Sequence, residues 1–182
     1  IPLKPFPGIM GVAPDTEDML STIPPRANGG NMDDPSLVEG TTVYFPVFVK
    51  GALFSIGDGH AVQGYGEVCG SAIEAPMTFT YRVRVIKDKP AIKEPQYETD
   101  EYYAVTGFGE TIDIATKKAV NYMVDHLSTN YNFSEEDAYM LCSLAGDLKI
   151  AEVVDVPNML VTMHFPKTCL LYTSDAADDI RR

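Results

Sequence analysis

The order of apolar and polar residues predicts strands in the first two thirds of the chain. From Met77 to Val85 apolar residues alternate with polar ones, the period of two that indicates a strand with one buried face. Three further runs are rich in β-branched and aromatic residues: Thr42 to Val49, Ala52 to Ile56 and Glu101 to Thr106. We therefore expect a strand at each of these runs and a further one at MLVTMHF near the C-terminus. The glycine-rich residues 57–70 are expected to form a loop after Ile56.

Two helices are expected after residue 107. Apolar residues spaced by four predict a helical face through about Ser128, formed by Ala115, Ala119, Met123 and Leu127. Ser134, with Asp137 three residues later, is a cap for the N-terminus of a second helix. Gly146 is placed to end that helix, and we expect the two helices to pair.

The first 40 residues predict an irregular extended segment, because PLKPFPG and IPPRANGG are rich in proline and glycine and show little periodicity. Short strands with glycine turns need a second sheet to cover their buried face. The whole pattern therefore predicts a mainly β fold, a jelly-roll-like β-sandwich with two helices near the C-terminus.

Composition narrows the class of protein. The 182 residues are 45% hydrophobic, enough for one sizeable core. The net charge of −12 argues against nucleic acid and anionic membranes as partners, and no apolar run approaches the ~20 residues of a membrane-spanning helix. Three cysteines without a CxxC pair favour free thiols in a reducing compartment, so we expect a cytoplasmic protein.

The segment GDGHAVQGYGEVCG contains the candidate chemistry. Asp58 and His60 are two residues apart, so an extended backbone places both side chains on one face. A glycine turn can bring Glu67 back towards them, and one imidazole with two carboxylates suits zinc. Two other interpretations remain open: ordinary turn chemistry at these residues, and a nucleophilic thiol at Cys69.

Five ordered segments carry a resemblance to a known family: PGIMGVAP, PPRANGGNMD, FPVFVKGALFSIGDGHAVQGYGEVCGSAIE, VTGFGE and DAYMLCSLAGDLKIAEVVDVPN. Together they resemble the acetamidase/formamidase family. The resemblance implies metal-assisted hydrolysis of small amides to a carboxylate and ammonia, with Asp58, His60 and Glu67 at the metal ion. It also implies a homo-oligomer. The family commonly has QGDGEV where this chain has QGYGEV, so Tyr65 replaces an acidic residue.

The resemblance also bears on the domain organisation. Complete members of the family carry a further β-rich portion before the start of this chain. We therefore expect residues 1–167 to form the C-terminal portion of a longer protein. Residues 168–182 resemble translated sequencing-adapter read-through, and we expect them to be a non-native tail.

Amide hydrolysis also needs a proton for the departing nitrogen. Glu74 is the first candidate for the carboxyl that supplies it, although a bulge or a kink at Gly70 is needed to bring Glu74 to the site. Asp33 is the second candidate. Asn31 and Gln63 are expected to contact the substrate, although Asn31 and Asp33 are also common turn residues.

A non-catalytic alternative remains. The glycine-rich segment of a β-sandwich binding module would hold a structural cation such as calcium. Calcium prefers oxygen ligands, so the imidazole of His60 is the feature that separates the two functions.

Overall fold

The computed structural model describes residues 1–170 and forms two antiparallel sheets and two helices. The four-stranded sheet has the order β2-β1-β4-β5 and consists of β1 (Phe6–Gly11), β2 (Gly29–Asn31), β4 (Ser55–Val62) and β5 (Ile73–Glu74). The five-stranded sheet has the order β3-β6-β7-β9-β8 and consists of β3 (Thr42–Tyr44), β6 (Gln96–Glu98), β7 (Tyr102–Gly109), β8 (Asp147–Glu152) and β9 (Met159–Pro166).

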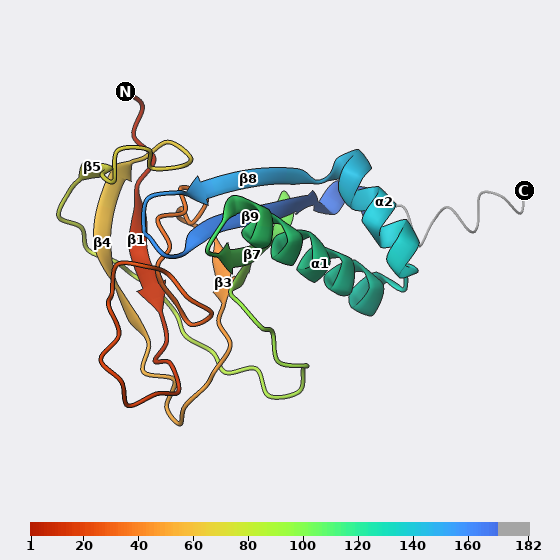
Figure 1. Cartoon of the computed structure of the whole chain (residues 1–182), viewed down its shortest axis with the longest axis horizontal. Coiled ribbons are helices and arrows are strands. Elements are labelled where there is room, and N and C mark those ends of the chain that lie inside the picture. The colour runs from red at the N-terminus through yellow and green to blue at the C-terminus, as the bar shows by residue number, and fades with distance from the viewer. Residues whose placement is uncertain (171–182) are drawn as a thin grey trace, which may run out of the picture.

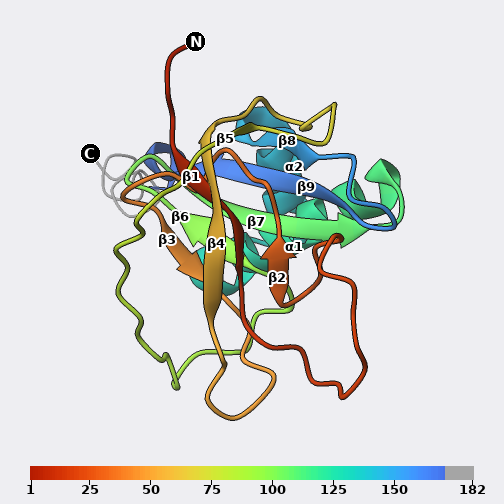
Figure 2. The same ribbon diagram turned by 90° about the vertical axis from the view of Figure 1, so that its left-hand side faces the viewer.

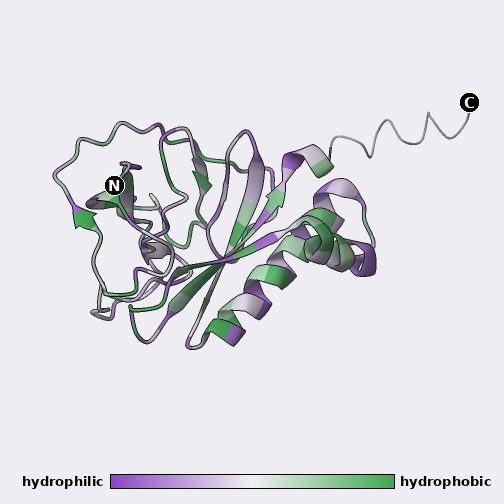
Figure 3. Ribbon diagram, turned by 90° about the horizontal axis from the view of Figure 1, so that it is seen from above, coloured by the Kyte–Doolittle hydropathy of each residue, from purple (hydrophilic) through white to green (hydrophobic). Residues whose placement is uncertain are grey.

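The two helices, α1 (Ile112–Tyr131) and α2 (Glu135–Ala145), pack beside the five-stranded sheet, and β1, β4 and β5 lie on its other side (Figures 1 and 2). Hydrophobic and hydrophilic bands alternate along α1 (Figure 3). The four predicted core positions of α1, Ala115, Ala119, Met123 and Leu127, are fully buried. The two predicted helices are thus confirmed, and they contact each other.

Polar caps set the ends of both helices. The Thr111 side chain accepts a hydrogen bond from the backbone N–H of Ile114 at the start of α1. Ser134 caps α2 in the predicted way, because its Oγ accepts from the N–H of Asp137 at 3.1 Å. Gly146 then ends α2, with its N–H donated to Cys142. Each such cap contributes about 1 kcal/mol.

The face of the five-stranded sheet opposite the helices has its own core. Tyr97, Ala104 and Leu160 of this sheet pack with Met32 and Leu37, which lie after β2. Met10 of β1 adds to the same cluster. Apolar contacts of β1 and of the residues after β2 therefore hold the four-stranded sheet against the five-stranded sheet.

The prediction for the first 60 residues differs from the structure in several places. The expected strands Thr42 to Val49 and Ala52 to Ile56 are strands only at Thr42–Tyr44 and from Ser55 on. The segment expected to be irregular contains β1, which pairs with both β2 and β4 even though it includes Pro7 and Gly8. The expected loop after Ile56 is also wrong at its start, because residues 57–62 continue strand β4. Both strands gain their hydrogen bonds from residues distant in sequence, which local propensity does not reveal.

The predicted strand from Met77 to Val85 is also wrong. Residues 75–86 are extended but belong to neither sheet. Three of the five apolar side chains of the alternation are exposed, with Tyr81 at 57%, Val83 at 65% and Val85 at 67%. An alternating segment becomes a strand only when a neighbour pairs with it, and no described strand pairs with Met77 to Val85.

The fold class is confirmed as mainly β with two helices. The jelly-roll-like β-sandwich, with its one domain over residues 1–167, stays a prediction. Lys167–Cys169 form a short 3-10 helix and Leu170 packs into the core between the helices and the sheet. The remainder of the predicted non-native tail lies outside the described residues. Within those residues, neither helix has the length and hydropathy needed to cross a membrane.

Candidate functional site

His60 lies at the centre of a cluster of carboxylates where β1, β4 and β5 run side by side. On β4 it is opposite Phe6 of β1 and opposite Glu74 of β5. The imidazole is buried, and the Phe6 ring meets it edge to face at 5.1 Å between centroids. The ring is thus held in place, and its two nitrogens face different groups of acids.

The outer group consists of Asp58 and Glu74. The Nε2 atom of His60 lies 3.2 Å from Oδ2 of Asp58 and 3.3 Å from Oε2 of Glu74. Asp58 has a left-handed backbone, with φ 55°, and the β4–β5 register shifts just after His60. The register shift is the irregularity expected for Glu74 to reach the site. Both carboxylates are partly open to solvent, with exposed fractions of 32% and 53%.

The inner group consists of Asp33 and Glu67, and both side chains are buried. Oδ1 of Asp33 is 3.7 Å from Nδ1 of His60. The ligand atoms of Asp33, His60 and Glu67 all lie within 4.8 Å of one another. Glu67 follows Gly66, whose N–H donates to the carbonyl of Ala151 at 2.8 Å. The glycine-rich segment is therefore anchored to β8 of the five-stranded sheet.

Gly8 forms the floor of the site. Its carbonyl accepts a hydrogen bond from the backbone N–H of Asp33 at 3.0 Å. A Cβ at Gly8 would lie 2.5 Å from Oδ1 of Asp33, 2.8 Å from Oδ2 of Asp58 and 2.8 Å from Cε1 of His60. Side chains from both groups therefore converge on the space that only glycine leaves open.

Asn31 and Gln63 bond to protein groups of the site. Nε2 of Gln63 donates to the backbone carbonyl of Asp33 at 2.6 Å, and its Oε1 lies 2.8 Å from Nδ1 of His60. Nδ2 of Asn31 donates to Oδ2 of Asp155 at 2.7 Å. In this structure both amides hold other site residues in position, and their expected contact with substrate stays a prediction.

The carboxylates perturb one another strongly. Burial raises the pKa of Asp33 to about 9, with further contributions from the negative charges of Glu67 and Asp155. Burial is also the main cause of the raised pKa values of Asp58, Glu67 and Asp155. Such a group of acids either retains protons or requires a cation.

Two buried acids next to the site, Glu152 and Asp155, were not predicted from the sequence. Glu152 is fully buried, and its Oε2 accepts from the backbone N–H groups of Val154 and Asp155, each at 3.0 Å. Burial raises the pKa of Glu152 to about 7. Asp155 in turn lies beside Asp33. The sequence did contain a signal for Glu152, because this acid lies within the apolar run IAEVV. An acid in such a run is expected to be buried, and buried acids are rare unless they are paired.

The cluster is suited to a divalent cation. One imidazole and several carboxylates are a nitrogen–oxygen set of the kind that zinc accepts. Oδ1 of Asp33 is buried without a hydrogen-bond partner, which is costly unless a proton or cation reaches it. The residues expected at the ion, Asp58, His60 and Glu67, all belong to the cluster, but Asp58 and Glu67 lie in different groups.

Tyr65, in the same glycine-rich segment, contacts residues outside both groups. Its hydroxyl lies 2.8 Å from Oγ of Ser36, and Nζ of Lys149 lies 5.3 Å from the centre of its ring. These contacts add to the attachment between this segment and β8.

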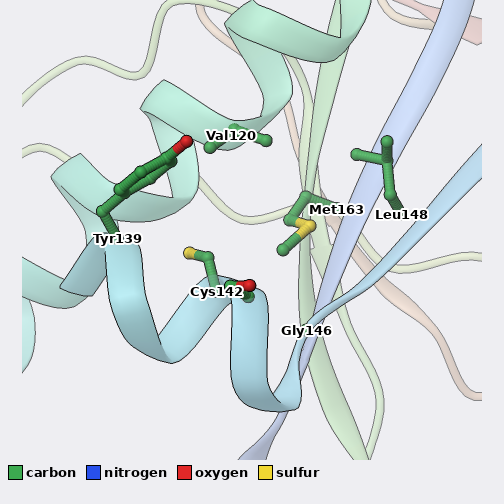
Figure 4. A pocket seen from close by; sticks show the side chains of 7 residues that line it. Val120, Tyr139, Cys142, Gly146, Leu148 and Met163 are labelled. Atoms are coloured by element: carbon green, nitrogen blue, oxygen red, sulfur yellow. The ribbon is translucent and has the colours of Figure 1, made fainter. Parts of the chain in front are cut away.

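A separate pocket of about 290 Å³ lies between the helices and strands β8 and β9 (Figure 4). Its lining includes Val120, Leu148 and Met163. The thiol of Cys142 also lines it, and burial raises the pKa of that thiol to about 11, so it is protonated at neutral pH. Cys69, the thiol beside the glycine-rich segment, is exposed. The protonated thiol of Cys142 is not an activated nucleophile, which depends on the thiolate form.

Comparison with known proteins places these features in context. A model of the "Acetamidase/Formamidase family" matches residues 16–170. A formamidase of Methylophilus methylotrophus is 33% identical over 167 residues, covering 80% of this chain. An acetamidase of Mycolicibacterium smegmatis is 46% identical over 72 residues, covering 38% of this chain and 18% of that protein.

Solved structures agree with the sequence matches. A predicted acetamidase/formamidase from the thermophile Thermoanaerobacter tengcongensis is 35% identical, with a TM-score of 0.84 over 96% of this chain and 57% of that one. An acetamidase from Bacillus halodurans is 31% identical, with a TM-score of 0.78 over 92% of this chain and 56% of that one. The chain spans only 40% of the Methylophilus formamidase.

Proposed function

Because the chain belongs to the acetamidase/formamidase family, we propose that the protein hydrolyses short linear amides, such as formamide or acetamide, with a divalent metal ion. The products are a carboxylate and ammonia. One observation carries the metal dependence: the imidazole of His60 shares two groups with four carboxylates, and within each group the ligand atoms lie within 4.8 Å of one another.

His60 and the surrounding carboxylates hold the ion, which we take to be zinc. When bound, such an ion lowers the pKa of a coordinated water to about 7 and polarises the amide carbonyl. The protein supplies the geometry. Phe6 holds the imidazole ring edge to face, and Gly8 leaves open the space in which the side chains meet.

Asp33 is the carboxyl that delivers the proton to the departing nitrogen. Burial raises its pKa to about 9, so the carboxyl retains a proton at neutral pH before the ion binds, and its Oδ1 lies 3.7 Å from Nδ1 of His60. Glu74, the other candidate, is about half exposed and lies beside Nε2 of His60. That position supports Glu74 as a ligand of the ion.

The setting of the enzyme follows the same assignment. We infer a cytoplasmic homo-oligomer. The cytoplasmic location is supported by three free thiols, those of Cys69, Cys142 and Cys169. We also infer that the two sheets form a β-sandwich, since Met10 and Met32 pack against the core of the five-stranded sheet.

The test is ammonia release from formamide and acetamide by the complete gene product that contains this chain. We expect release that disappears after chelation and returns when zinc is added. His60→Ala should abolish release. His126→Ala should retain it, because His126 lies in α1, stacks on Tyr103 and belongs to neither group of acids. If the zinc-loaded protein releases no ammonia from either amide, the proposed activity is wrong.

The calcium-binding module is the weaker alternative. Calcium takes six to eight oxygen ligands, whereas both candidate groups share the imidazole of His60. Elemental analysis of the purified protein distinguishes the two functions directly.

A further inference from the structure

The side-chain amide of Gln63 has only one orientation that satisfies both of its neighbours. The backbone carbonyl of Asp33 can only accept a hydrogen bond, so the group 2.6 Å from it must be the NH₂ of Gln63. The carbonyl oxygen of the amide must then face Nδ1 of His60, at 2.8 Å. The usual ambiguity of an amide orientation is thus removed by a main-chain group.

This orientation determines the tautomer of His60. Because Oε1 of Gln63 can only accept, Nδ1 of the ring must carry a hydrogen and donate it. In the neutral ring, Nε2 then has a lone pair and no hydrogen. That lone pair faces Oδ2 of Asp58 at 3.2 Å and Oε2 of Glu74 at 3.3 Å.

Three acceptor atoms therefore meet at one point. Two carboxylate oxygens and a ring nitrogen repel one another unless a cation or a shared proton lies between them. The same argument works against Nδ1 as a ligand, because its hydrogen is already donated to Gln63. The two groups around His60 are consequently not equivalent for a metal ion.

We propose that Gln63 is a positioning residue that fixes the His60 tautomer, so that the ion binds Nε2 of His60 with Asp58 and Glu74, and not Nδ1 with Asp33 and Glu67. The inference rests on the proposed function for its ion. It revises the sequence-based set by replacing Glu67 with Glu74. The geometry leaves Asp33 and Glu67 buried behind the ring, where no ligand role is needed.

Nuclear magnetic resonance of ¹⁵N-labelled protein loaded with ¹¹³Cd²⁺ tests the assignment. Cadmium stands in for zinc, and coupling between ¹¹³Cd and ¹⁵N identifies the bound nitrogen without prior assignment of the three histidines. We expect coupling on Nε2 of one imidazole and a retained hydrogen on Nδ1 of the same ring. Coupling on Nδ1, or none at saturating cadmium, would overturn the proposal.

Variants test the role of Gln63. Gln63→Met keeps the shape but removes the acceptor, and we expect it to weaken cadmium and zinc binding by about 10- to 100-fold, as is usual when the partner of a ligating histidine is lost. Gln63→Glu loses the donor to the Asp33 carbonyl but retains an acceptor for Nδ1, so it should preserve the tautomer. Gln96→Met, in β6 of the other sheet, is the matched control and should bind as the unaltered protein does.

A second pair of variants compares the two groups. Glu74→Gln should weaken zinc binding by a larger factor than Glu67→Gln, as measured by competition with a chromophoric chelator. The opposite order, or unchanged affinity in Gln63→Met, would refute the assignment. Ammonia release is measured separately: its absence in a protein that shows the expected nitrogen coupling would remove the proposed activity but leave the ion site intact.

Discussion

At the scale of single residues, the site depends on a position with no side chain. Gly8 leaves room for three side chains that a Cβ would meet at 2.5 to 2.8 Å. We expect Gly8→Ala to destabilise the protein by about 1–3 kcal/mol, the usual effect of overpacking, and to weaken zinc binding. Urea unfolding and zinc titration measure both effects. Gly57→Ala, in the neighbouring strand with open space around its Cβ, is the control; equal behaviour of the two variants would contradict the expectation.

The titration of Asp33 makes a second residue-level prediction. Its pKa rises from 3.8 to about 9 on folding, so between these values the folded cation-free protein retains a proton that the unfolded chain has released. This contribution to stability is fully present below about pH 4 and is lost as the pH rises through about 9. We therefore expect the free energy of unfolding to decrease with rising pH in the presence of a chelator, by up to about 1.4 kcal/mol per pH unit for each such proton.

Asp33→Asn removes this titration. The variant should lose stability less steeply with pH and should be more stable than the unaltered protein at pH 8 without a cation. Thermal or urea unfolding at pH 5, 7 and 9 tests this, with the exposed Asp18→Asn as control. A pH profile unchanged by Asp33→Asn would show that Asp33 is ionised in the folded protein.

At the scale of elements, strand β7 and helix α1 approach each other closely at Gly107. A Cβ at Gly107 would lie 2.2 Å from the carbonyl oxygen of Ala115 and 2.7 Å from the backbone nitrogen of Ala119. Helix backbone cannot yield as a flexible side chain can, so we expect Gly107→Ala to cost about 3 kcal/mol, the upper end for overpacking. Urea unfolding measures the loss. Lys117→Ala on the exposed side of α1 should change stability by less than about 0.5 kcal/mol.

The elements also show what sequence can reveal. Helix α1 was predictable because its signal is local: residues spaced by four share one face, and all four core positions are buried. Strand β1 was not, because Ile9 pairs with Asn31 on one side and Gly57 on the other. The cluster around His60 was partly predictable, since Asp58, His60 and Glu67 lie in one glycine-rich segment. Asp155 was missed because its bond to Asn31 joins residues 124 positions apart.

At the scale of the whole molecule, the two sheets are joined at the site. The glycine-rich segment leaves β4 and bonds to β8, through Gly66 to Ala151 and Val153 to Gly66. Asn31 at the end of β2 reaches Asp155 beyond β8. The segments that carry acids around His60 are therefore bonded to the second sheet or its loops, and cation binding is expected to stabilise the association of the two sheets along with the site itself.

Residues 75–86 belong to neither of the two sheets. Although their alternation predicts a strand, Ala75 at their start makes a single backbone bond to Gly59 of β4, and Val83 is 65% exposed. Proline at Val83 should therefore change the free energy of unfolding by less than about 0.5 kcal/mol. Proline at Val161, which pairs with β7 and β8 on its two sides, should cost about 3 kcal/mol or more, because it removes a ladder hydrogen bond from a central strand. Urea unfolding of the two variants gives the comparison, and a large loss at Val83 would show that this segment is paired as a strand after all.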